Sequence, residues 1–132
     1  MANILVIDDE RDVRIVLKEV LQREGYDVTL AVNGREGLQK LESGGADLVV
    51  TDVIMPGIDG VEIVERIRET YPDMPIIVVS GGGNVAPMDY EPGAISTSAY
   101  LASAKTAGAD RTLTKPFERQ EFVAVVKELL GD

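Results

Sequence analysis

The 132-residue sequence contains no cysteine and no histidine. Without cysteine there are no disulfides and no thiol nucleophile, and without either residue the usual ligands of a zinc site are missing. The absence of histidine also excludes a Ser-His-Asp triad and any phosphohistidine carried by this chain itself. The chemistry of this protein must therefore use carboxylates, hydroxyls and lysines.

Basic residues and long apolar runs are also scarce. The chain has 13 Lys and Arg against 23 Asp and Glu, a formal net charge of −10. Binding to a nucleic-acid backbone depends on a clustered basic face, so we expect no direct contact with nucleic acid. No run approaches the roughly 18 apolar residues of a membrane span, and the N-terminus lacks the pattern of a signal peptide. We expect a cytoplasmic protein that does not bind membranes.

Short apolar runs rich in β-branched residues recur along the chain. They cover residues 4–7, 48–50 and 76–79, and weaker examples cover 28–32 and 111–114. Continuous apolar runs of this length, each followed by polar or glycine residues, are typical of buried parallel strands. The sequence therefore predicts five strands.

Segments with helical spacing lie between these strands. In the first segment the apolar residues with this spacing are Val13, Val16, Leu17, Val20 and Leu21. Asn33 with Glu36, and Asp59 with Glu62, have the spacing of an N-cap residue and its N3 partner, which predicts two helix starts. With a last amphipathic segment near the C-terminus, the pattern predicts five helices that alternate with the strands.

Strictly alternating strands and helices predict a parallel sheet with helices on both faces. The length fits one domain, so we assign residues 1–132 to a single unit. Ligands of such sheets bind beyond the carboxyl ends of the strands. The polar residues that follow the predicted strands at that end are Asp8, Asp9, Asp52, Ser80 and Lys115.

Four short motifs at these positions resemble the receiver domain of two-component response regulators. They are Ile-Asp8-Asp9-Glu, Thr-Asp52-Val-Ile-Met-Pro-Gly, Val-Ser80-Gly and Thr-Lys115-Pro116-Phe. Each motif is common by itself, but this order at four strand ends is specific, and the resemblance spans nearly the whole chain. It implies a doubly wound α/β fold, with a five-stranded parallel sheet of order 2-1-3-4-5 and five helices. Such a fold is a flavodoxin-like (CheY-like) three-layer sandwich.

The resemblance also implies roles for these residues. Asp52 would accept a phosphoryl group, which Ser80, Lys115 and the backbone amide of Gly81 would contact. The metal ligands would be Asp8, Asp9, Asp52 and the backbone carbonyl of Ile54. Mg²⁺ would be the cofactor, with Mn²⁺ as an alternative.

The carboxylates point to a cation without the resemblance. Three carboxylates that converge at one end of a sheet repel one another unless a cation lies between them. A ligand set made only of oxygens favours Mg²⁺. As an alternative, Asp8 and Asp9 could cap the first helix, where the helix dipole favours negative charge.

The expected function is phosphorelay signalling. The phosphoryl group would come from a histidine kinase or a histidine phosphotransfer protein, and a conformational change would pass the signal to a protein partner. The chain would catalyse its own phosphorylation and dephosphorylation and would otherwise not be an enzyme. One alternative is an adaptor that uses the fold for docking without phosphorylation. Another is a flavodoxin-like FMN protein, although Asp8, Asp9 and Glu10 would repel the FMN phosphate.

Two features depart from the family pattern. The stretch between Ser80 and Lys115 is unusually long, and its composition predicts an extended loop at about residues 81–97 before a helical segment at 99–107. Thr112 stands where receivers usually have an aromatic residue that turns inward on phosphorylation. We therefore expect the signal to pass through the loop. Because the chain ends at Asp132 shortly after the last predicted helix, we expect a stand-alone receiver without an output domain.

Overall fold

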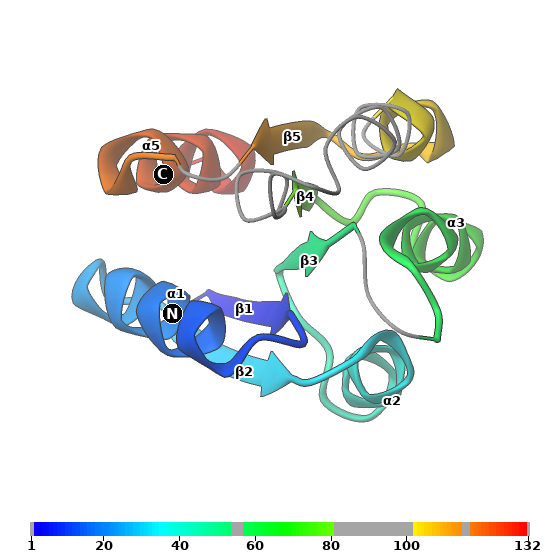
Figure 1. The fold of residues 1–132 in the computed structure, drawn as a ribbon, viewed down its shortest axis with the longest axis horizontal. Coiled ribbons are helices and arrows are strands. Elements are labelled where there is room, and N and C mark those ends of the chain that lie inside the picture. Colours follow the sequence, from blue (N-terminus) through cyan, green and yellow to red (C-terminus); the bar gives the residue numbers. More distant parts are fainter. Residues whose placement is uncertain (1, 54–56, 81–101, 115–116, 132) are drawn as a thin grey trace, which may run out of the picture.

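The computed structural model describes residues 2–53, 57–80, 102–114 and 117–131 (Figure 1). Its strands are β1 (Asn3–Ile7), β2 (Asp27–Ala31), β3 (Leu48–Asp52), β4 (Ile76–Ser80) and β5 (Arg111–Thr114). Its helices are α1 (Arg11–Arg23), α2 (Gly34–Gly44), α3 (Gly60–Thr70) and α5 (Arg119–Leu130). A short helical segment at 102–107 precedes β5. The predicted alternation of strands and helices is confirmed, and no helix in the described ranges is long and apolar enough to cross a membrane.

The five strands form one parallel sheet in the order β2-β1-β3-β4-β5. Figure 1 shows α1 and α5 on one face of this sheet, and α2, α3 and the helical segment at 102–107 on the other. The predicted fold class and strand order are therefore confirmed.

Each face of the sheet has its own apolar layer, because successive side chains of a strand point to opposite faces. The layer toward α2 and α3 includes Leu5, Ile7, Val49, Ile76 and Val78. The layer toward α1 and α5 includes Ile4, Val6, Leu48, Val50, Ile77 and Val79. Burial on both faces explains why these strands read as continuous apolar runs rather than as alternating ones.

Both predicted helix starts are confirmed. The Asn33 side chain accepts a 2.8 Å hydrogen bond from the backbone N–H of Glu36, and Asp59 accepts one of 3.0 Å from Glu62. Helix α1 begins differently, because its N-cap residue is Glu10 and no side chain caps it. Asp8 and Asp9 therefore precede the cap position, and the Asp8 carboxylate accepts from the backbone N–H of Glu10 itself.

The apolar face of α1 is narrower than the sequence predicts. Leu17 and Leu21 are buried, and Val13 and Val20 pack against the same layer. Val16 is 56% exposed, so its predicted place on the buried face is wrong. Val16 lies at the edge of the apolar face of α1, beyond the part that the sheet and α5 cover.

Arg68 near the end of α3 holds the chain that leads into β5. Its guanidinium donates to the main-chain oxygen of Gly108 at 3.1 and 2.8 Å, to that of Met74 at 2.6 Å, and to the Asp110 carboxylate at 2.9 Å. The same carboxylate accepts from the backbone N–H of Ile76 at 2.8 Å. The starts of β4 and β5 are thereby fixed to α3.

Gly60, the first residue of α3, lies against the end of β3. Its backbone N–H donates to the carbonyl of Val53 at 2.8 Å. A Cβ atom at this position would lie 2.5 Å from the Asp52 carbonyl oxygen and 2.6 Å from the Val53 Cα. Only glycine allows the helix to begin so close to the strand end that carries Asp52.

We expect Gly60→Ala to lower the free energy of unfolding by about 1 to 3 kcal/mol, because the new methyl group would overlap backbone that cannot yield. Gly44→Ala is the matched control, since a Cβ atom added there would meet no other part of the described structure within 4 Å and alanine favours a helix. Urea denaturation of both variants measures the difference. Equal stability of the two variants would contradict the close approach of α3 to β3.

Candidate functional site

The register of the sheet brings the predicted site residues to one end. Ile7 pairs with Thr51, Asp52 pairs with Val79, and Ser80 pairs with Thr114. Residues that follow β1, β3, β4 and β5 therefore meet at the carboxyl end of the sheet, where doubly wound folds bind ligands.

Three carboxylates gather at this end. Among the described residues, Asp8, Glu10 and Asp52 each offer an oxygen, and these oxygens lie within 4.8 Å of one another. Asp8 is 1% exposed and Asp52 is 3% exposed, whereas Glu10 lies at the surface. Asp9 is also exposed and does not belong to this group. The sequence pattern predicts Asp8 and Asp52 together at this end, but it does not include Glu10, which stands two residues after Asp8.

Asp8 is held by hydrogen bonds to β2, to its own loop and to α1. Its backbone N–H donates to Ala31 at the end of β2 at 3.1 Å. Its Oδ1 accepts from the backbone N–H of Glu10 at 2.8 Å, and its carbonyl oxygen accepts from Nη1 of Arg14 at 2.8 Å. Both the side chain and the backbone of Asp8 are thus fixed.

Asp52 is the last residue of β3 and is fixed by its neighbours in the chain. Thr51 Oγ1 donates to the Asp52 carbonyl oxygen at 3.0 Å, and the backbone N–H of Val53 donates to Val79 at 2.9 Å. With Gly60 packed against the same carbonyl oxygen, the backbone of Asp52 is enclosed by β4 and by the start of α3.

This arrangement fits a hard divalent cation. Two of the three carboxylates are almost fully buried, and their mutual repulsion is poorly screened in a low-dielectric environment. Mg²⁺ prefers oxygen ligands and binds a few carboxylates while it keeps several of its waters. Because Glu10 is exposed, one side of the acidic group is open to these waters. Asp8, Asp52 and an acidic residue of the β1–α1 loop could hold such an ion.

Other predicted site residues lie outside the described part of the chain. These are Ile54, Gly81 and Lys115, and the loop predicted at 81–97 lies there too. The backbone of Ser80 ends β4, but the position of its side chain is not described. Thr112 is described: it is half-buried on β5 and pairs with Val78.

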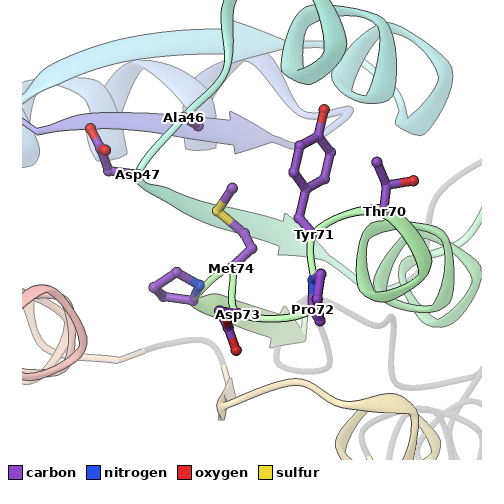
Figure 2. A pocket seen from close by; sticks show the side chains of 8 residues that line it. Ala46, Asp47, Thr70, Tyr71, Pro72, Asp73 and Met74 are labelled. Atoms are coloured by element: carbon purple, nitrogen blue, oxygen red, sulfur yellow. The ribbon is translucent and has the colours of Figure 1, made fainter.

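A surface hollow of about 440 Å³ lies at the opposite end of the sheet. Figure 2 shows its labelled residues, which come from the chain just before β3, from the last residue of α3 and from the connection between α3 and β4, with Tyr71 and Met74 lining it. It lies at the amino ends of these strands, away from the acidic group. The carboxylates and not this hollow therefore mark the candidate site.

Comparison with known proteins agrees with the site. The family model of the response regulator receiver domain matches residues 4–91. The response regulator MprA of Mycolicibacterium vanbaalenii is 39% identical over 127 residues, which is 96% of this chain and 49% of the relative. The transcriptional regulatory protein YkoG of Bacillus subtilis is 34% identical over 128 residues, 97% of this chain and 50% of the relative.

Solved structures show the same likeness. The response regulator protein TrrA of Thermotoga maritima, crystallised in complex with Mg²⁺-BeF, has a TM-score of 0.81 and 39% identity, and the match covers 98% of this chain and 100% of that one. A CheY-like receiver domain protein of Methanospirillum hungatei has a TM-score of 0.82 and 28% identity, with 99% of this chain and 94% of that one covered.

This chain spans about half the length of the curated relatives that it matches. Its match to the family model extends from β1 through β4 and includes all three clustered carboxylates. The chain belongs to the response regulator receiver domain family.

Proposed function

We propose that Asp52 is the phosphoacceptor of this receiver and that its phosphorylation requires Mg²⁺. The observation that carries the proposal is the position of Asp52 at the carboxyl end of β3. It is 3% exposed, and its carboxylate lies within 4.8 Å of the carboxylates of Asp8 and Glu10. A carboxylate held among other acids is a strong site for a cation and, once the charge is neutralised, a nucleophile for phosphorus.

In the proposed reaction an Asp52 carboxylate oxygen forms a bond to phosphorus while the N–P bond of a phosphohistidine breaks. The imidazole of the donor leaves and takes up a proton. Catalysis of such a transfer is mostly positioning and neutralisation of the charge on the phosphoryl oxygens. Dephosphorylation would transfer the group to water and regenerate the carboxylate. We propose no other catalytic activity for this domain.

The cation would supply the charge neutralisation on one side of the phosphoryl group. Asp8, Asp52 and the backbone carbonyl of Ile54 would bind it, together with Asp9 as the resemblance implies or Glu10 as the geometry supports. On the other side we propose the Ser80 hydroxyl, the Gly81 amide and the Lys115 ammonium group as contacts. The register that sets Ser80 beside Thr114, the residue before Lys115, supports this arrangement.

The donor would be a histidine kinase or a histidine phosphotransfer protein, because this chain has no histidine of its own. Phosphohistidine is made from ATP, so we place the exchange in the cytoplasm. We treat residues 1–132 as one receiver domain whose loop at 81–97 passes the signal to a protein partner. Since one relative of twice this length is named a transcriptional regulatory protein, the expectation of no nucleic-acid contact concerns this domain alone.

Incubation with acetyl phosphate and Mg²⁺ should add one phosphoryl group to the wild-type protein, and intact mass measures it. Asp52→Asn should show no gain, because the amide is not a nucleophile. Asp73→Asn, an exposed site at the opposite end of the sheet, should react like the wild type. A phosphoryl group on Asp52→Asn would refute the assignment, and no gain on the wild type would favour the adaptor.

Asp52→Asn should also raise the free energy of unfolding in the absence of divalent cations, by on the order of 1 kcal/mol, because it removes one of three mutually repelling carboxylates. Glu19→Gln, on the exposed face of α1, should change stability by less than about 0.5 kcal/mol. Mg²⁺ should stabilise the wild type more than Asp52→Asn, since it binds the folded wild type more tightly. Urea denaturation with and without Mg²⁺ tests both statements, and a less stable Asp52→Asn without metal would contradict them.

Calorimetric titration with Mg²⁺ should separate the two candidate ligands of the β1–α1 loop. We expect Asp9→Ala to weaken binding strongly, as the family resemblance implies, and Glu10→Gln to weaken it by a smaller factor. Asp73→Asn again serves as the control for the change in net charge. If Asp9→Ala binds Mg²⁺ as the wild type does, the role of Asp9 as a ligand is wrong.

A further inference from the structure

Arg14 connects the first turn of α1 to the acidic loop that precedes it. Its backbone N–H donates to the carbonyl of Glu10 at 3.1 Å, and its Nη1 donates to the carbonyl of Asp8 at 2.8 Å. The backbone of Glu10 in turn donates to Oδ1 of Asp8 at 2.8 Å. Asp8, Glu10 and Arg14 therefore form a closed set of hydrogen bonds across the loop and the helix start.

The Asp8 carbonyl belongs to the peptide unit that joins Asp8 to Asp9. Because a peptide unit is planar, holding its oxygen also fixes the direction of the bonds to the two flanking Cα atoms. The orientation of this unit decides where the side chains of Asp8 and Asp9 point. The N-cap residue of α1, Glu10, makes no side-chain capping bond to the first turn, so the bonds of Asp8 and Arg14 are the described contacts between loop and helix.

We propose that Arg14 is a positioning residue for the cation site. Its guanidinium sets the peptide between Asp8 and Asp9, and thereby the carboxylates that bind the cation beside Asp52. The inference rests on the proposed function, because it concerns the metal that the phosphoryl transfer requires. In this role Arg14 acts through the Asp8 carbonyl, without direct contact with metal or phosphoryl group.

Electrostatics alone predicts the opposite effect of Arg14. A guanidinium next to the site repels a divalent cation, so the loss of its charge would tighten Mg²⁺ binding. Loss of a positioning hydrogen bond would weaken Mg²⁺ binding, because the carboxylates would no longer be held in the binding geometry. Partners that orient metal ligands typically contribute about 10- to 100-fold to metal affinity. The sign of the change therefore distinguishes the two roles.

The test is calorimetric titration of Arg14→Gln with Mg²⁺. We expect the dissociation constant to rise about 10- to 100-fold. Lys18→Gln removes the same charge one turn further along α1, where the side chain is exposed, and should bind Mg²⁺ as the wild type does or slightly more tightly. In the metal-free state, amide hydrogen exchange of residues 8–12 should be faster in Arg14→Gln than in Lys18→Gln.

Arg14→Lys is a second variant, which keeps the positive charge but carries its hydrogen-bond donor on a shorter side chain. We expect its Mg²⁺ affinity to fall below that of the wild type, a loss that cannot come from charge.

Unchanged or tighter binding by Arg14→Gln would overturn the inference, as would equal hydrogen exchange in the two glutamine variants. If the wild type itself binds no Mg²⁺, the proposed function fails. If the wild type binds Mg²⁺ and is phosphorylated at Asp52 while Arg14→Gln keeps its affinity, the role of Arg14 alone is wrong.

Discussion

The repulsion among carboxylates at the carboxyl end of the sheet is the constraint that the rest of this structure must offset. Asp8 and Asp52 are almost fully buried, and Glu10 brings a third carboxylate within 4.8 Å of both. An arrangement of this kind costs stability in the folded protein until a cation neutralises it. The folded protein tolerates this cost because the burial of apolar side chains in the rest of the domain holds the strand ends together.

That burial comes from two separate layers, one on each face of the sheet. Because both layers are closed by helices, the strands cannot shift along one another without exposing apolar side chains to water. At the amino ends of β4 and β5, Arg68 and Asp110 add a polar connection to α3. The positions of Asp8 and Asp52 are therefore set by the whole domain, and the acidic group is a consequence of sheet register.

The local supports of the site differ for the two buried aspartates. Asp52 is supported by close backbone packing, in which Gly60 lets α3 begin against the end of β3. Asp8 is supported by hydrogen bonds from the loop and from Arg14 of α1. A packed support tolerates no added atom, whereas a hydrogen-bonded support can change when one donor is lost. Of the supports of these two aspartates, the one in the β1–α1 loop is thus the more easily altered.

The sequence by itself determined the strands, the alternation with helices, the helix starts at Asn33 and Asp59, and the pairing of Asp8 with Asp52 as site residues. These features depend on short-range patterns: apolar runs, the spacing of a cap and its partner, and acids placed directly after strands. Strand order was available only through the family resemblance, since spacing along the chain does not say which strands pair. Tertiary structure alone decided that Glu10 joins the acidic group, that Val16 faces solvent, and that Arg14 reaches the carbonyl of Asp8. Each of these depends on the path of a loop or on which flank of a helix its neighbours cover, and residues distant in the sequence determine both.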